Sequence, residues 1–186
     1  MAKKILVLNG GPRLAGNTAA LIEAFAEGAE TAGNAVTRFD LDRMDIHGCK
    51  GCLCCRKNPD SPCVQKDDMG KIYPVYREAD VVVFAGPMYY RGITGQLKIA
   101  LDRLFAVTES GDPNWAPPKK NTVLLMASEG DSEANAKPVI DWYKSLVGFL
   151  DWQDLGMIVA GGNLRIGDIK GKPEIEKARN LGASIA

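Results

Sequence analysis

The residues best suited to chemistry begin with a glycine-rich stretch at residues 9–18, Asn-Gly-Gly-Pro-Arg-Leu-Ala-Gly-Asn-Thr. Its glycines let the backbone turn tightly and approach a ligand closely. Asn17 and Thr18 open a helix-forming segment, whose free N–H groups and dipole favour an anion, and Arg13 adds a cation suited to phosphate. Because the stretch matches neither a Walker A loop nor Gly-x-Gly-x-x-Gly, it indicates a monophosphate ligand. An ordinary strand-to-helix turn capped by Asn17 is the alternative interpretation.

Two further loops have a composition suited to ligand binding. Residues 86–95, Gly-Pro-Met-Tyr-Tyr-Arg-Gly-Ile-Thr-Gly, carry two tyrosines that could pack on a flat heteroaromatic ring. Surface tyrosines at a loop tip are the alternative. Residues 128–131, Ser-Glu-Gly-Asp, are again short, polar and glycine-bearing. We expect the three loops to meet in one cleft.

The cysteines form a second chemical feature, because all five lie within residues 49–63. A disulfide framework would spread them along the chain, so their clustering indicates a metal or redox site. The spacing C-x₂-C-x₂-C-x₇-C is formed by Cys49, Cys52, Cys55 and Cys63, with Cys54 extra. Four thiolates so spaced can hold a [4Fe–4S] cluster or zinc, and free thiols or a redox pair remain an alternative. His47 beside them is interpreted as a loop residue, since four thiolates already complete a site.

The elements that must position these residues follow from hydrophobic patterning. Continuous apolar runs at 5–8, 81–85, 122–127 and 156–160 are typical of buried parallel strands, and 35–41 alternates like an edge strand. Helices are predicted at 17–32, 67–79, 92–105, 132–150 and 173–185, with Pro74 and Pro138 as irregularities. This alternation predicts an α/β, flavodoxin-like three-layer sandwich with a five-stranded parallel sheet in the order 2-1-3-4-5. Ligands of such sheets bind at the carboxyl ends of the strands.

Composition limits the remaining possibilities. The 186 residues suit one domain spanning 1–186, and 23 basic against 23 acidic residues give no nucleic-acid footprint or polybasic membrane patch. Apolar runs of about seven residues are too short to span a membrane. The N-terminus lacks the features of a signal peptide, so we expect a cytoplasmic protein.

The chain resembles the NAD(P)H-dependent FMN reductase family. Gly10-Gly-Pro-Arg…Gly-Asn-Thr18 is similar to its Gly-Ser-Pro-Arg…Gly-Asn-Thr phosphate loop, and Gly86-Pro-Met-Tyr…Gln96-Leu-Lys…Leu101-Asp-Arg103 to its isoalloxazine loop and following helix. The resemblance implies bound FMN, electrons from NAD(P)H, and a homodimer or dimer of dimers. It implies that the phosphate is held by Gly11, Arg13, Asn17 and Thr18. It implies that the ring is lined by Pro87, Met88, Tyr89, Tyr90 and Gly92, and flanked by Ser128, Glu129 and Gly130. Gly11 stands where many members have serine, which implies weaker phosphate affinity.

A narrower resemblance links the cysteine motif to iron–sulfur flavoproteins of the same superfamily. The leading hypothesis is an FMN-dependent oxidoreductase passing electrons from NAD(P)H to a quinone, flavin, metal complex or other acceptor. The alternative is an iron–sulfur flavoprotein that acts as an electron carrier for a redox protein and has no small-molecule substrate of its own. A non-redox phosphate binder would leave the tyrosines and cysteines without a purpose. No side chain is needed as a nucleophile, so we name no catalytic residue. We expect a dimer interface near Tyr89, Tyr90 and the segment 114–118.

Overall fold

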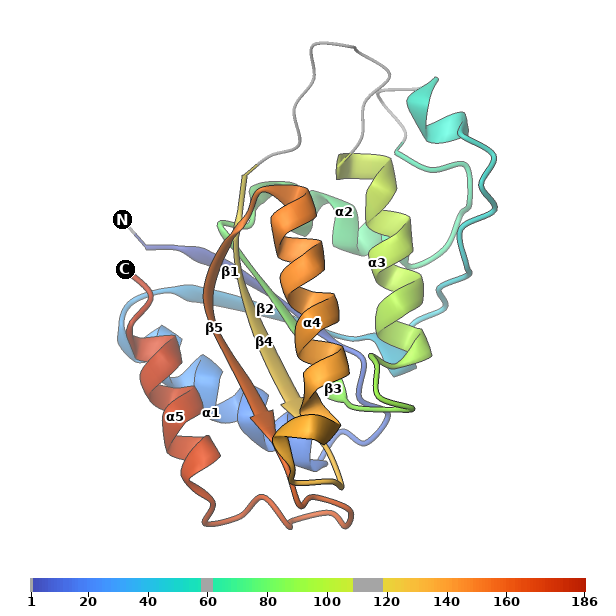
Figure 1. Cartoon of the computed structure of the whole chain (residues 1–186). Helices are drawn as coiled ribbons and strands as arrows, with labels where there is room; N and C mark the ends of the chain where they lie inside the picture. Colours follow the sequence, from blue (N-terminus) through green and yellow to red (C-terminus); the bar gives the residue numbers. More distant parts are fainter. Residues whose placement is uncertain (1, 58–61, 109–118) are drawn as a thin grey trace.

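A computed structural model describes residues 2–57, 62–108 and 119–186. These residues contain a parallel sheet in the order β2-β1-β3-β4-β5 (Figure 1). Its strands are β1 (Lys4–Asn9), β2 (Ala35–Asp40), β3 (Val81–Pro87), β4 (Asn121–Ala127) and β5 (Gln153–Ala160). The predicted fold class and strand order are therefore confirmed. The sequence-predicted dimer segment 114–118 lies outside the described residues.

Helices cover both faces of the sheet. The helices are α1 (Asn17–Thr31), α2 (Met69–Glu78), α3 (Gly95–Thr108), α4 (Glu133–Leu150) and α5 (Pro173–Ala183), with short 3₁₀ turns η1 (Leu41–Arg43) and η2 (Cys54–Arg56). Figure 1 shows α1 and α5 on one face and α2, α3 and α4 on the other. Alternate residues of β1 face the two layers, since Ile5 and Val7 pack with α1 while Leu6 and Leu8 pack with α2 and α3. No helix in the described part of the chain is both long enough and apolar enough to cross a membrane.

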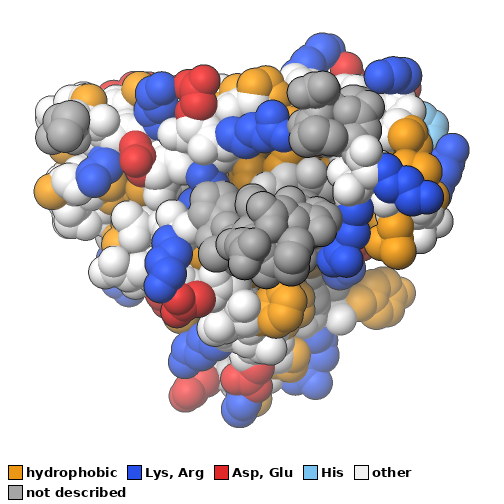
Figure 2. Space-filling view, turned by 90° about the horizontal axis from the view of Figure 1, so that it is seen from above, with side chains coloured by type: hydrophobic (Ala, Val, Ile, Leu, Met, Phe, Trp, Pro, Cys, Tyr) orange, Lys and Arg blue, Asp and Glu red, His pale blue; other side chains and the backbone are white. Residues whose placement is uncertain are grey.

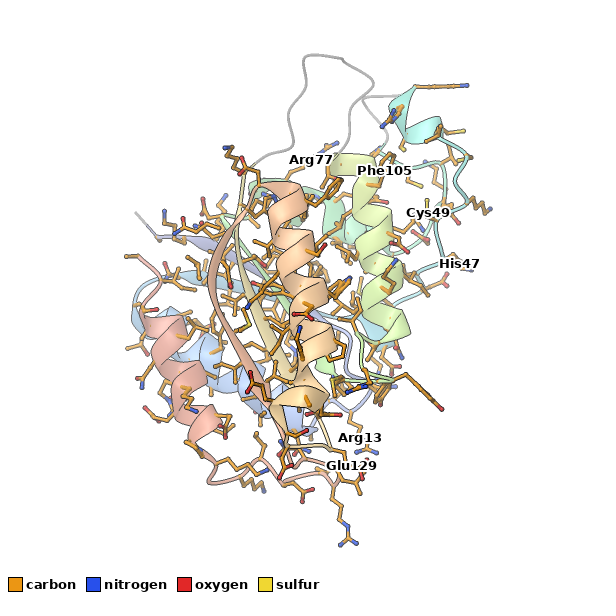
Figure 3. All side chains as sticks on the ribbon, in the orientation of Figure 1. Arg13, His47, Cys49, Arg77, Phe105 and Glu129 are labelled. Carbon is orange, nitrogen blue, oxygen red and sulfur yellow. The ribbon has the colours of Figure 1, made fainter. Side chains whose placement is uncertain are left out.

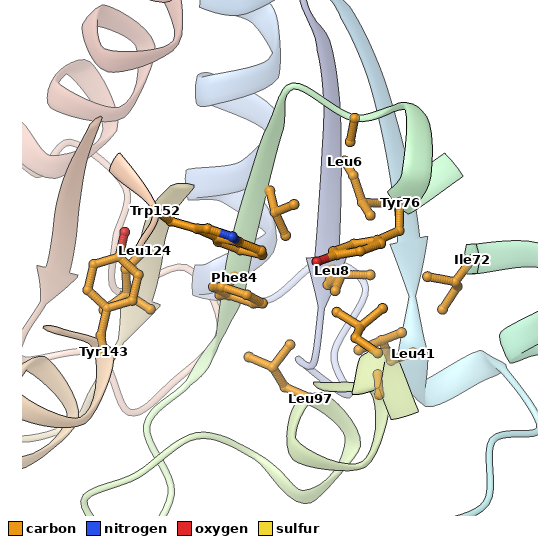
Figure 4. Packing of buried hydrophobic residues seen from close by; sticks show 14 of the residues in the cluster. Leu6, Leu8, Leu41, Ile72, Tyr76, Phe84, Leu97, Leu124, Tyr143 and Trp152 are labelled. Carbon is orange, nitrogen blue, oxygen red and sulfur yellow. The ribbon is translucent and has the colours of Figure 1, made fainter. Parts of the chain in front are cut away.

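The layer beneath α3 and α4 has an aromatic centre. Trp152 stacks on Phe84 with ring centroids 6.4 Å apart, and Tyr76 lies 6.3 Å from Trp152 (Figure 4). Tyr76 and Phe84 are fully buried and Trp152 is nearly so. Burial of such large side chains is a main source of folding free energy in a domain of this size.

Element boundaries differ slightly from the sequence prediction. Helix α3 begins at Gly95 rather than residue 92, because Tyr89 and Gly92 exchange backbone hydrogen bonds of 3.0 Å in a tight turn. Strand β5 begins at Gln153, three residues early, where polar side chains hide the apolar pattern. Pro74 and Pro138 both lie inside their helices, each within the second turn.

Candidate functional site

A small cleft of about 210 Å³ opens at the carboxyl edge of the sheet. Its walls come from the segments that follow β1, β3, β4 and β5. Figure 3 shows Arg13 and Glu129 together at this end of the molecule. The three loops expected from sequence to share a cleft therefore do so, and a fourth joins them after β5. The lining residues are Gly11, Pro12, Arg13, Gly16, Asn17, Thr18, Pro87, Met88, Tyr89, Ala127, Ser128, Glu129, Asn163 and Leu164.

The glycine-rich turn after β1 is held by a buried asparagine. The Oδ1 atom of Asn9 accepts a 2.9 Å hydrogen bond from the backbone N–H of Gly11, and its amide donates to Asp40 at 2.7 Å. Gly10 passes so close to the start of α3 that a Cβ there would lie 2.3 Å from Oγ1 of Thr94. The turn therefore requires glycine at position 10 for close packing.

The N-terminus of α1 forms one wall of the cleft and is not capped by the protein. Gly16, the N-cap residue, offers no side-chain acceptor. The backbone N–H groups of Asn17 and Thr18 make no hydrogen bond within the described residues, and neither does the hydroxyl of buried Thr18. Unpaired donors at a helix N-terminus suit an anionic group such as phosphate.

Asn17 and Arg13 also tie this wall to the segment after β5. The amide of Asn17 donates to the carbonyl of Arg165 at 2.8 Å, and its Oδ1 accepts from the N–H of Gly167 at 3.0 Å. Arg13 donates to the carbonyl of Leu164 at 3.3 Å. Because these hydrogen bonds occupy the side chain of Asn17, its backbone N–H is the group that this residue leaves unpaired at the cleft.

The tyrosine loop after β3 is a strained two-residue turn. Tyr90 and Arg91 at its tip have φ values of 47° and 63°, in the left-handed region that non-glycine residues disfavour. Arg91 anchors the tip by donating to the carbonyl of Ala134 at 2.8 Å. Tyr89 faces the cleft and is half exposed, whereas Tyr90 projects fully into solvent. Strain of this kind is common in ligand-binding loops.

The loops after β4 and β5 are joined to each other. The N–H of Asn163 donates to the carbonyl of Ser128 at 2.8 Å, and the N–H of Gly162 donates to that of Glu129 at 3.0 Å. Asn163 is buried, and its amide donates to Ala160 and Gly161. Its Oδ1 atom has no partner among the described residues. An unsatisfied buried acceptor at a cleft suits a ligand N–H or hydroxyl group.

Nine of the twelve sequence-predicted cofactor residues line the cleft. Tyr90, Gly92 and Gly130 lie in the same loops but do not line it. Sequence reasoning missed Asn163 and Leu164, although the Gly-Gly-Asn that follows the last apolar run, at 156–160, was an available signal. The carboxyl end of that strand lies at the same edge as the others.

The cysteine loop, residues 44–66, lies elsewhere. Its described residues do not line the sheet-edge cleft, and Figure 3 places Cys49 beside α3, away from Arg13 and Glu129. It borders a larger cavity of about 560 Å³ between α3 and α4, called here the α3–α4 pocket. The lining of this pocket includes Cys49, Cys52, Cys55 and Cys63 but not Cys54. The side chains of the described residues are nevertheless not gathered into a group of three or more that could hold a metal ion.

The thiols of the cysteine loop differ in acidity. The backbone N–H and side chain of Cys54 stabilise the thiolate of Cys52 and lower its pKa, while the neighbouring Cys52 raises the pKa of Cys54. Burial raises the pKa of Cys55. Cys52 is exposed and is therefore the thiol best placed to react or bind metal.

A buried ion pair fastens both ends of the cysteine loop to α3. Arg103 donates to the two carboxylate oxygens of Asp67 at 2.6 and 3.0 Å, and to the carbonyl of His47 at 2.7 Å. Burial alone would raise the pKa of Asp67. The hydrogen bonds from Arg103 and from the backbone N–H of His47 outweigh burial and hold it below its ordinary value. The predicted role of His47 as a loop residue fits this arrangement, since its backbone makes both contacts.

Comparison with known proteins adds the following findings. A family model described as NADPH-dependent FMN reductase matches residues 3–164. An iron-sulfur flavoprotein of Methanosarcina thermophila is 32% identical over 93% of this chain and 85% of that protein. An iron-sulfur flavoprotein of Archaeoglobus fulgidus is 27% identical over 98% of this chain and 79% of that protein. The structure of an NAD(P)H:quinone oxidoreductase from Methanothermobacter marburgensis superposes with a TM-score of 0.74 and covers 98% of this chain and 96% of that chain. The sequence identity is 18%, so this similarity concerns the fold.

Proposed function

This chain belongs to the NADPH-dependent FMN reductase family, and we propose that its sheet-edge cleft holds FMN by the phosphate at the start of α1. FMN, when bound, accepts a hydride from reduced nicotinamide and passes the electrons to an acceptor. The observation that carries the proposal is the uncapped N-terminus of α1, whose N–H groups, with the Thr18 hydroxyl and Arg13, face the cleft. These donors match a phosphate in both charge and hydrogen-bonding capacity.

The residues on either side of the cleft would position the flavin ring. Pro87, Met88 and Tyr89 offer apolar and aromatic surface, while Ser128 and Glu129 stand on the loop after β4. The free Oδ1 of Asn163 would accept a hydrogen bond from the cofactor. The chain's part in the reaction is then to bind, to orient and to restrict water, and no side chain has to form a covalent bond.

The size of the cleft supports a homodimer or a dimer of dimers. Pockets that enclose a drug-sized ligand measure roughly 300–1,000 Å³, whereas this cleft measures about 210 Å³. One chain would therefore cover only part of FMN, and exposed Tyr90 stands where a second copy could cover the rest. Sedimentation of the FMN-loaded protein at micromolar concentration tests this, and a monomer would contradict it.

We expect a small oxidised molecule such as a quinone, a flavin or a metal complex as acceptor. The solved NAD(P)H:quinone oxidoreductase of similar fold makes quinones the first compounds to assay. NADH and NADPH should each be mixed with the FMN-loaded protein in a stopped-flow instrument. Flavin bleaching followed by recovery on addition of quinone is the expected result, and absence of bleaching with both donors contradicts it.

The phosphate assignment is tested by Arg13→Ala. This substitution should weaken FMN binding at least tenfold. The affinity for riboflavin, which lacks the phosphate, should stay within about twofold of the wild-type value. Arg43→Ala is the matched control, since Arg43 is exposed and does not line the cleft. Equal loss of both ligands in Arg13→Ala would show that the residue does not contact phosphate.

A second candidate function, an iron–sulfur electron carrier, is favoured by the placement of the cysteines. The four cysteines of the C-x₂-C-x₂-C-x₇-C pattern line one cavity and Cys54 does not. Four thiolates supply the donor set for a [4Fe–4S] cluster, although their present arrangement would have to close around it. Two relatives that are named iron-sulfur flavoproteins add weight.

Anaerobic reconstitution distinguishes a cluster, zinc and free thiols. Iron and sulfide should be retained by the wild type and by Cys54→Ala but lost in Cys52→Ala. Zinc retained without sulfide would indicate a zinc site. No metal in any of the three proteins would leave the cysteines as thiols.

A further inference from the structure

The α3–α4 pocket has the size and lining of a small-molecule site. Its volume of about 560 Å³ falls within the range of roughly 300–1,000 Å³ typical of ligand pockets. The described lining is mostly apolar and comes from α2, α3, α4, the residue just before β5 and the cysteine loop. Its large apolar residues are Leu53, Leu101, Leu104, Phe105, Trp142, Leu146, Phe149, Leu150 and Trp152. It shares no described residue with the sheet-edge cleft.

Three buried polar atoms without partners are carried by residues that line this pocket. They are the hydroxyl of Tyr76, Nε of Arg103 and Nε1 of Trp152, on residues that are 0%, 2% and 7% exposed. Figure 4 shows the hydroxyl of Tyr76 directed toward the side chain of Trp152. The indole and the guanidinium can only donate hydrogen bonds, and leaving such groups unpaired in a core is costly. They require an acceptor that the described residues do not provide.

The charges around the pocket favour an acceptor that is anionic or strongly polar. Lys98 is balanced by Asp102 at 2.6 Å, and Arg103 by Asp67. Lys50 lines the pocket and makes no ion pair with a described residue. Figure 2, which views the molecule from above, shows Lys and Arg side chains on this surface together with some Asp and Glu, and hydrophobic side chains exposed between them. A single negative charge on the ligand would therefore be tolerated.

From these observations we propose that the α3–α4 pocket is a second ligand site, for a flat aromatic molecule bearing one carboxylate or carbonyl oxygen. The aromatic body packs between α3 and α4. The oxygen accepts a hydrogen bond from an unpaired donor on the lining residues, which are Nε1 of Trp152, the hydroxyl of Tyr76 and Nε of Arg103. This site is independent of the FMN cleft, so occupation of one leaves the other available.

The test uses 2-naphthoate as the probe with the FMN-loaded protein. Calorimetry should give one molecule per chain without release of FMN, and tryptophan fluorescence should change with the same saturation curve. Tyr76→Phe keeps the ring and removes one donor, whereas Trp152→Phe replaces the indole by a smaller ring that has no donor. Each should weaken 2-naphthoate binding roughly tenfold. Naphthalene, which lacks the carboxylate, should bind weakly, and equally to the wild type and to Tyr76→Phe, whose ring is unchanged.

The matched control is Tyr143→Phe. Its hydroxyl is also buried within this layer, but it is bonded to Asp154 at 2.9 Å and does not line the pocket. It should leave 2-naphthoate affinity unchanged. Equal affinity in all four proteins, or no saturable binding, would overturn the proposal. So would displacement of FMN, which would place the probe in the cleft.

A second copy of the chain is the competing occupant. Phe149 stands at the rim and is 79% exposed. If two chains close over the pocket, Phe149→Glu should give monomers, and only these should bind 2-naphthoate. That outcome would assign the pocket to subunit contact instead.

Discussion

The sheet-edge cleft and the α3–α4 pocket are built in opposite ways. The cleft is formed by the segments that follow four parallel strands, one of which contains a turn with positive φ values at Tyr90 and Arg91. The pocket is formed by side chains from α2, α3 and α4, by Trp152 and by the cysteine loop, which one buried ion pair fastens in place. Each contains buried polar atoms without partners: one acceptor on Asn163 in the cleft, and three donor-bearing groups in the pocket. We therefore expect each region to favour a ligand with complementary hydrogen-bonding groups.

If the pocket depends on side chains, removing Arg103 should have the largest effect. Arg103→Met keeps the length of the side chain but leaves the carboxylate of Asp67 buried and unpaired. We expect a loss of about 3–5 kcal/mol in the free energy of unfolding, measured with urea. FMN affinity per folded molecule should be unchanged, because Arg103 does not line the cleft.

The control for this prediction is Lys4→Met, which removes an exposed pair with Glu78. It should change stability little, since such pairs are screened by solvent. A similar loss in both variants would show that the buried pair does not anchor the loop.

Adding a single methyl group to the glycine-rich turn should change both the stability of the protein and the FMN affinity of the cleft. Gly10→Ala places a Cβ 2.3 Å from Oγ1 of Thr94 and 2.7 Å from Cβ of Leu97. We expect about 1–3 kcal/mol of destabilisation, together with weaker FMN binding because the phosphate loop has to move. Thermal unfolding and quenching of flavin fluorescence measure the two effects.

Gly48→Ala in the cysteine loop is the counterpart, since a Cβ there meets nothing within 4 Å. It should leave FMN affinity and stability nearly unchanged. If both variants weaken FMN equally, the close approach at Gly10 is not what shapes the cleft.

The same contrast explains what the sequence could predict. The cleft follows from local signals, because parallel strands bring the loops after each apolar run to one edge, and Arg13, Thr18 and Ser128 line one cleft there. The exposed position of Tyr90 could not be predicted, because it depends on the backbone geometry of its turn, which the residue types there do not indicate. The Arg103–Asp67 pair joins positions 36 residues apart, and only folding reveals that such charges meet.

A smaller effect is expected from relieving strain in the tyrosine turn. Tyr90 has a φ of 47° and a fully exposed side chain, so Tyr90→Gly loses no packing within the chain. Glycine removes the steric penalty but adds flexibility to the unfolded chain, and we expect a net gain of about 0.5 kcal/mol. If Tyr90 helps to cover the flavin, FMN affinity should fall in the same variant.

The converse change is Gly33→Ala, at a φ of 87° with open space around it. It should cost about 1 kcal/mol and leave FMN affinity unaltered. A loss of stability in Tyr90→Gly would show that the turn is not strained.

The smallest effect is a dependence on pH at the anchor of the cysteine loop. The pKa of Asp67 is lower in the folded protein than in the unfolded chain, because its hydrogen bonds from Arg103 and His47 outweigh the effect of burial. Its contribution to stability is therefore complete above the ordinary aspartate value of about 4 and is lost as the pH falls through the lowered value. Asp67→Asn has no such titration. Urea unfolding of the two proteins should be measured from pH 6 to pH 3. The wild type should have the larger free energy of unfolding at pH 6, and the difference between the two proteins should narrow below pH 4. Asp68, whose pKa is also lowered, is common to both proteins, so the difference between them isolates Asp67. A gap that stays constant over this range would mean that Asp67 is not held ionised by Arg103, and the loop would then depend on packing alone.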